Sequence, residues 1–181
     1  MDQDSLSSFT AATGNAWATS GPEIVELCRH AMALLMAAEP DEPWLAALHR
    51  DRPATRELYR HPIHGFMLLA HTENEGLYRP PHDHGRAWVV YGVQSGALEI
   101  GTYARVAAPN GTVSLVERDR SVLRAGEARA YYAGDIHDTR CLSDTALLFR
   151  FTERDLKVED QVERKLTRFV ERNGRWTAPG Q

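Results

Sequence analysis

From Gly65 onward the chain consists of short runs that favour β-strands, separated by glycines. The runs are rich in valine, leucine, tyrosine and phenylalanine, and they cover residues 66–70, 88–93, 98–103, 113–116, 128–132 and 146–151. No helical pattern lies between them, which excludes the βαβ units of a parallel sheet. Many short strands at close spacing predict an all-β barrel or sandwich.

The N-terminal part of the chain has a helical pattern instead. The sequence Ser-Gly-Pro at 20–22 can begin a helix, and apolar residues then recur at helical spacing as far as Met36. A second, shorter helix can start at Pro43. We therefore expect two N-terminal helices within a segment of about 20–52, followed by a barrel over about 60–178.

The end of the chain allows two interpretations. Residues 155–166 are highly charged and are compatible with a helix. The sequence Arg-Asn-Gly-Arg at 172–175 is typical of a tight turn between 169–170 and 176–177, because Asn-Gly favours a two-residue hairpin loop. We favour the hairpin.

Composition limits the classes of protein to consider. With 181 residues the chain suffices for one hydrophobic core, so we expect a single domain over 1–181. A formal charge of −4 gives no basic field for nucleic acid. The polar start at 1–19 is unlike a secretory signal, and no apolar run is long enough for a membrane span. Two distant cysteines, Cys28 and Cys141, fit a reducing, cytoplasmic interior.

The candidate chemistry lies in Pro80-Pro81-His82-Asp83-His84. Two histidines two positions apart leave the same face of a strand, so both rings can bind one metal ion. Asp83 then points to the opposite face, where we expect a hydrogen-bonding or turn role. Such a pair arises by chance in roughly a third of chains with this many histidines, so its surroundings must decide.

Around this pair the chain resembles the cupin superfamily, whose motifs read G-x5-H-x-H-x3,4-E-x6-G and G-x5-P-x-G-x2-H-x3-N. The positions that agree at fixed offsets are Gly76, His82, His84, Gly96, Gly126, Gly134 and His137. Val89 replaces the glutamate of the first motif, and Tyr132 and Cys141 replace the proline and asparagine of the second. The resemblance implies a cupin jelly-roll (double-stranded β-helix) barrel that holds one transition-metal ion on His82, His84 and His137.

Three histidines without a carboxylate are similar to the cysteine dioxygenase group of thiol dioxygenases, over roughly 56–151. This resemblance implies a mononuclear non-haem Fe(II) site, with Ni, Zn and Mn as alternatives, O2 and a small anionic, thiol-bearing substrate. It also implies an arginine upstream of the histidine pair that binds the substrate carboxylate, a role that falls to Arg56. The group's Ser-His-Tyr relay has no counterpart in 147–152, and Val89 cannot form its cysteine–tyrosine crosslink. Cupins often dimerise, so a homodimer is a further expectation.

Three other residues are candidates for the pocket. Tyr131 and Tyr132 are adjacent on a strand, so one of them points inward, and we take Tyr132 as the candidate catalytic tyrosine. Arg150 alternates with Phe149 and Phe151, so it faces either the barrel interior or solvent, and strand periodicity alone cannot choose.

The residues themselves favour oxidation of a small anion. Three neutral imidazoles leave the full charge of a divalent metal uncompensated, which favours an anionic chelating substrate. Three protein ligands also leave coordination positions open for that substrate and for dioxygen. The leading hypothesis is an Fe(II)-dependent dioxygenase-like oxidoreductase. The alternatives are a dicarbonyl-cleaving cupin dioxygenase, whose pocket lacks a carboxylate-binding arginine, and a non-catalytic, metal-dependent small-molecule-binding cupin.

Overall fold

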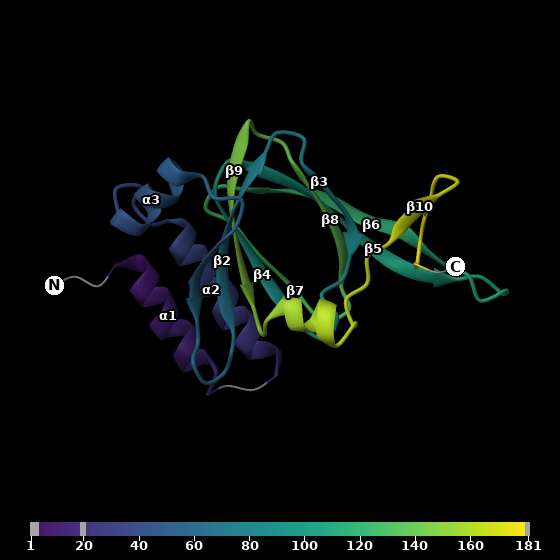
Figure 1. The fold of residues 1–181 in the computed structure, drawn as a ribbon, viewed down its shortest axis with the longest axis horizontal. Helices are drawn as coiled ribbons and strands as arrows, with labels where there is room; N and C mark the ends of the chain where they lie inside the picture. The colour runs from purple at the N-terminus through teal and green to yellow at the C-terminus, as the bar shows by residue number, and fades with distance from the viewer. Residues whose placement is uncertain (1–3, 19–20, 180–181) are drawn as a thin grey trace.

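Two antiparallel sheets form the body of the protein in a computed structural model that describes residues 4–18 and 21–179 (Figure 1). One sheet has the strand order β1-β2-β9-β4-β7 and the other β10-β11-β6-β5-β8-β3. The strands are β1 (Arg56–Arg60), β2 (Met67–Asn74), β3 (Tyr78–His82), β4 (Val89–Ser95), β5 (Ala97–Ala107), β6 (Val113–Arg124), β7 (Ala128–Tyr131), β8 (Ile136–Cys141), β9 (Thr145–Thr152), β10 (Val170–Arg172) and β11 (Arg175–Thr177). The predicted all-β jelly-roll barrel is confirmed.

Each strand expected from the sequence is present, and three more occur at β1, β3 and β8. These three lack the usual strand pattern: β3 contains two prolines, and β8 reads Ile-His-Asp-Thr-Arg-Cys. Proline cannot donate to a sheet ladder, which fits the position of β3 at the edge of its sheet. The strands that carry the histidines are therefore the ones with the weakest strand pattern.

The N-terminal region contains three helices rather than the two expected: α1 (Ser5–Ala16), α2 (Pro22–Met36) and α3 (Pro43–Asp51). The expected start of α2 included Ser20, which lies outside the described residues. The prediction missed α1 because its sequence is rich in serine and threonine. The Asp4 carboxylate caps α1 by accepting a hydrogen bond from the Ser7 backbone N–H at 2.7 Å, and Phe9 and Thr13 are buried. No helix of the described residues is long and apolar enough to cross a membrane.

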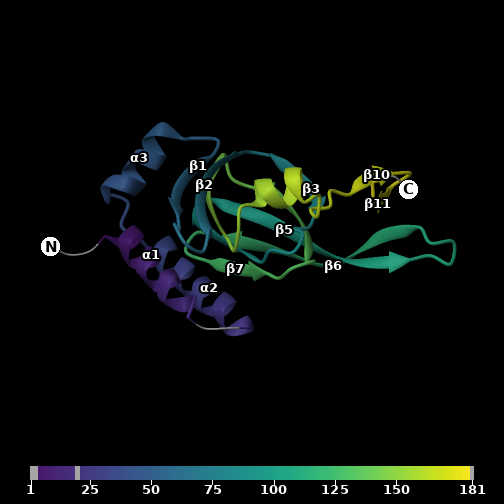
Figure 2. The same cartoon turned by 60° about the horizontal axis from the view of Figure 1, so that its bottom comes forward.

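The C-terminal part contains both structures that the sequence allowed. A π-helical turn, η1 (Val158–Val162), lies within the charged segment. The hairpin of β10 and β11 follows, and the backbone φ angles of Asn173 and Gly174 are 50° and 72°, as a type I′ turn requires. Figure 2 shows this hairpin beside the far end of β5 and β6, on the side of the barrel away from the helices.

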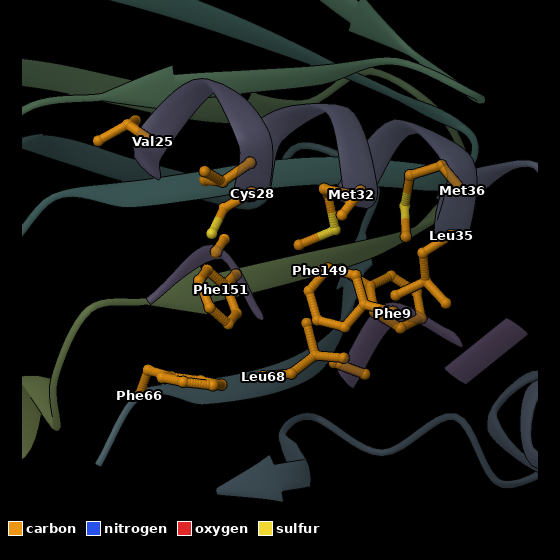
Figure 3. Packing of buried hydrophobic residues seen from close by; sticks show 14 of the residues in the cluster. Phe9, Val25, Cys28, Met32, Leu35, Met36, Phe66, Leu68, Phe149 and Phe151 are labelled. Carbon is orange, nitrogen blue, oxygen red and sulfur yellow. The ribbon is translucent and has the colours of Figure 1, made fainter. Parts of the chain in front are cut away.

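Two apolar clusters share the sheet that contains β9. On its outer face, side chains of β9 and β2 pack under α1 and α2 (Figure 3). Phe149 and Phe151 belong to this cluster and are fully buried. The second cluster lies between the two sheets and includes Leu148 and Tyr91. Successive residues of β9 therefore alternate between the helix-covered face and the barrel interior.

Gly96 and Gly126 offer a matched test of this packing, because both are motif glycines with positive φ angles, 79° and 86°. A Cβ atom at Gly96 would lie 2.5 Å from the Thr145 carbonyl oxygen, whereas one at Gly126 would meet nothing within 4 Å. Gly126→Ala should cost about 1–2 kcal/mol of unfolding free energy through backbone strain. Gly96→Ala should cost about 1–3 kcal/mol more through the clash. Urea denaturation of both variants measures the difference, and equal losses would contradict the packing at Gly96.

Candidate metal centre

The three predicted metal ligands meet between the two sheets. His82 ends β3 and pairs in register with His137 on β8, while His84 follows in the turn after β3. One ring nitrogen from each of the three lies within 4.8 Å of the others. The centroids of the three rings are 4.9–5.2 Å apart. Segments far apart in the sequence thus bring the three imidazoles to one point.

The state of each imidazole fits metal binding. The His82 Nδ1–H donates to the Pro80 carbonyl oxygen at 2.8 Å, which leaves Nε2 with a lone pair. His84 and His137 are buried, and their Nδ1 atoms have no hydrogen-bond partner among the described residues. Their Nε2 atoms each lie 3.3 Å from the hydroxyl of Tyr91. The single Tyr91 hydroxyl hydrogen can satisfy only one of these two Nε2 atoms, so a lone pair remains that a metal ion would satisfy.

Burial also keeps these histidines neutral. It lowers the pKa of His82, and it lowers the pKa of His84 and His137 well below the ordinary value. A charged imidazole loses its water shell when buried, so the neutral form is favoured. The neutral imidazole is the form that binds metals, so this donor set is ready to ligate at neutral pH.

Two buried aspartates hold the ligand strands from the opposite face. Asp83 accepts hydrogen bonds from the backbone N–H groups of Gly85 at 3.1 Å and Thr167 at 2.8 Å, and it forms an ion pair with Arg105. This is the hydrogen-bonding role expected for it. Asp138, next to His137, accepts bonds from the hydroxyls of Tyr78 and Tyr103 and from the Gly101 N–H. The backbone is therefore anchored both between His82 and His84 and next to His137.

His82 and His84 line a pocket of about 860 Å³. Its walls come from β1, β2, β4 and β9 and from the C-terminal segment around η1. Arg150 lines this pocket because its neighbours Phe149 and Phe151 pack under the helices. Strand periodicity left open whether Arg150 faces the barrel interior or solvent. Because the helices cover the other face of β9, Arg150 faces the interior.

Arg150 carries an uncompensated charge inside the pocket. Whereas Arg79 pairs with Glu73 at 2.7 Å, Arg150 pairs with no carboxylate among the residues that the structure describes, and its buried Nε has no hydrogen-bond partner there. After burial, the charge of Arg150 is the next cause that lowers the pKa of His71. The half-buried Arg150 guanidinium, which also lies beside the Tyr91 hydroxyl, keeps a donor that a carboxylate can accept from.

The structure does not bring Arg56 or Tyr132 to the histidines. Arg56 forms an ion pair with Asp51 at 3.1 Å and lies outside the pocket, although Thr55 and Glu57 on either side of it line the wall. Alternation along β1 directs its side chain away. Tyr132 is 41% exposed beyond the end of β7, so it is not the inward tyrosine.

The inward tyrosine of that pair is Tyr131. It is buried, and its ring centroid lies 4.1 Å from that of His137. The tyrosine hydroxyl that reaches the histidines comes instead from Tyr91, which the sequence analysis did not single out. Its place on β4, on the same face as Val89 and Val93, was the available signal.

No protein-family model and no curated protein matches the chain. Among solved structures, KdgF from Halomonas sp. is similar with a TM-score of 0.44 and 19% identity, over 60% of this chain and 83% of that one. The Schizosaccharomyces pombe Cnp3 cupin domain gives 0.44 and 10%, over 59% and 63%. An oxalate oxidase in complex with the substrate analogue glycolate gives 0.38 and 23%, over 49% and 41%.

The converging imidazoles predict one divalent ion per chain. His137→Ala should weaken metal binding by more than about 100-fold. Removing a residue that only hydrogen-bonds to a metal ligand costs up to about that factor, and removing a ligand itself costs more. His71→Gln is the matched control, because His71 is also a buried histidine of this pocket but lies outside the three-histidine group. Metal analysis and calorimetric titration with Co²⁺ measure both. Two ions per chain, or unchanged affinity in His137→Ala, would show that the ligand set is different.

His71 also predicts a pH dependence of stability. Burial lowers its pKa to about 3, whereas the unfolded chain titrates near pH 6.5, so below that pH the unfolded state binds a proton that the folded state does not. Stability therefore falls as the pH drops from about 6.5 towards 3. Between pH 7 and pH 5 the loss from His71 is about 2 kcal/mol. In urea denaturation, the loss of unfolding free energy between pH 7 and pH 5 should be smaller by this amount in His71→Gln than in the wild type. In the control His30→Gln, which replaces an exposed histidine, the loss should be the same as in the wild type.

Proposed function

We propose that this protein is an Fe(II)-dependent dioxygenase that oxidises a small, carboxylate-bearing molecule with O2, in the manner of the thiol dioxygenases that its sequence resembles. The observation that supports this most directly is a group of three converging neutral imidazoles, of which His82 and His84 line the same pocket as Arg150, a guanidinium that pairs with no carboxylate among the described residues. The first group fits a metal and the second fits an anion.

His82, His84 and His137 would hold the iron as three neutral ligands. When bound, ferrous iron supplies the electrons that dioxygen requires and leaves open positions for a chelating substrate. The protein's contribution is to present the imidazoles in the neutral form and to shield them, since His84 and His137 are almost completely buried. Exclusion of water strengthens electrostatic interactions in such a site.

Arg150 would orient the substrate by its carboxylate. It is the register partner of Tyr91 on β4, and Tyr91 contacts two of the histidines, so a carboxylate on Arg150 lies one strand away from the ligand cluster. A guanidinium can bind both carboxylate oxygens at once, which fixes the orientation of the bound molecule. We therefore assign to Arg150 the role that the resemblance gave to Arg56.

Tyr91 would hold a proton beside the reacting atoms. Burial raises the pKa of its phenol, so the hydroxyl stays protonated at neutral pH. This hydroxyl lies 3.3 Å from ring nitrogens of both His84 and His137. From this position it can donate a hydrogen bond to a substrate atom bound beside the three histidines.

The charged wall of the pocket favours this function over cleavage of a dicarbonyl, for which we expected a pocket without a carboxylate-binding arginine. We further propose that the substrate carries a thiol beside its carboxylate, because the sequence resembles that of the thiol dioxygenases. The non-catalytic binding protein is an outcome that the following experiment distinguishes.

The protein loaded anaerobically with Fe(II) should consume O2 in the presence of a thiol-bearing carboxylate, and the zinc-loaded protein should not, because zinc has no accessible redox state. An oxygen electrode measures this across thiols and dicarbonyls. Equal product formation with zinc would indicate a hydrolase or an isomerase. Binding of these compounds without any turnover would indicate the binding protein.

Arg150→Gln should raise the apparent KM by about 10- to 100-fold, because it removes a charge-assisted hydrogen-bonded contact of about 1.5–3 kcal/mol. Arg56→Gln is the matched control and should leave KM unchanged, since Arg56 pairs with Asp51 outside the pocket. The reverse result would restore the role of Arg56 and refute that of Arg150.

A further inference from the structure

His71 is a second polar group in the pocket that has no partner. It lies on β2, lines the same pocket as His82 and His84 and is only 7% exposed. Its Nε2 atom has no hydrogen-bond partner within the described part of the chain. A buried ring nitrogen that faces a pocket without a partner indicates a ligand group that completes it.

The surroundings of His71 fix which kind of partner Nε2 requires. The Thr55 hydroxyl lies 3.0 Å from His71 Nδ1 and 2.8 Å from the Ala54 carbonyl. The Ala54 carbonyl, which can only accept, also pairs with the His71 ring, and Nε2 has no partner among the described residues, so Nδ1 carries the hydrogen of the ring. In a neutral imidazole Nε2 is then an acceptor. The pocket therefore presents a buried acceptor that requires a donor.

Sheet register places this acceptor relative to Arg150. Arg150 pairs with Tyr91 on one side and with Leu69 on the other, and His71 pairs with Leu148. His71 is thus a diagonal neighbour of Arg150 on the inner face, with Cα atoms about 7–8 Å apart. Tyr91 and His71 lie on opposite sides of Arg150, on strands two spacings or about 10 Å apart.

We infer that the substrate is a hydroxycarboxylate, whose carboxylate binds Arg150 and whose hydroxyl donates to His71 Nε2 on the side away from the metal ligands. This deepens the proposed function and rests on it through Arg150. A hydroxyl fits better than an ammonium group, because the positive charges of Arg150 and Arg79 act at His71 and oppose a second cation. The pocket volume of about 860 Å³ accommodates a molecule that is bound by Arg150, by His71 and by a metal ion on the three histidines.

Calorimetry on the zinc-loaded protein, in which no turnover interferes, tests this with four matched probes: butanoate, 4-hydroxybutanoate, 4-methoxybutanoate and 4-aminobutanoate. The hydroxy acid should bind about 3- to 10-fold more tightly than butanoate, the range for one net hydrogen bond. The methyl ether, which accepts but cannot donate, should show no such gain. Tighter binding of the amino acid than of the hydroxy acid would overturn the choice of hydroxyl.

Variants assign the preference to His71. His71→Phe should abolish the preference for the hydroxyl, whereas His71→Gln, which keeps an acceptor, should retain part of it. Thr55→Val leaves the imidazole in place but removes an oxygen that accepts from the Nδ1–H, so the hydrogen is held on Nδ1 less firmly and the preference should weaken. Thr72→Val is the matched control, because Thr72 lies on the opposite face of β2 from His71 and does not line the pocket, and it should change nothing. A preference that persists in both His71→Phe and Thr55→Val would overturn the inference.

The same titrations separate failure of this inference from failure of the proposed function. If Arg150→Gln weakens all four probes equally but no probe is preferred in the wild type, the carboxylate site stands and the hydroxyl site is refuted. If no probe binds, or if Arg150→Gln has no effect, the carboxylate site fails and the hydroxyl site fails with it.

Discussion

Both the fold and the site depend on the two-sided burial of β9. Its central position between β2 and β4 gives it a helix-covered face and an interior face. Phe149 and Phe151 fill the first, and the helix α2 lies so close to the sheet that a Cβ at Gly92 would fall 2.7 Å from Met32. Apolar packing under the helices therefore fixes the orientation of β9. That orientation is what directs Arg150 towards the histidines.

Having two separate cores explains how the barrel tolerates polar groups in its interior. An unsatisfied buried donor or acceptor costs about 1–3 kcal/mol, and both Arg150 and His71 carry one. The helix-covered cluster is almost wholly apolar and contains the largest aromatic side chains. It shares no residue with the lining of the pocket, so the opposite face of the same sheet can keep polar groups without partners.

Sequence alone located the three histidines that converge but not the rest of the pocket, and the reasons are physical. Fixed offsets between glycines and histidines identified His82, His84 and His137 because tight turns demand glycine at set positions. A period of two divides a strand into faces without saying which face is inside, so Arg150 stayed undecided until the helices were placed. Arg56 was assigned by its distance along the chain, and the alternation of β1 turned it outward. Helix α1 was missed because capping and three buried positions, rather than an apolar stripe, hold it.

The ligand loop depends on a part of the chain that the motifs do not include. The backbone of Asp83 donates to the Thr167 carbonyl, its carboxylate accepts from the Thr167 N–H, and Phe169 N–H donates to the Pro81 carbonyl. Glu159 in η1 is buried and pairs with Arg86, two residues after His84. The segment from η1 to β10 thus forms one wall of the pocket and also holds the turn that carries two of the three imidazoles. Because the same contacts shape the pocket wall and set the positions of His82 and His84, a change in this segment that reshapes the pocket would also shift these two imidazoles.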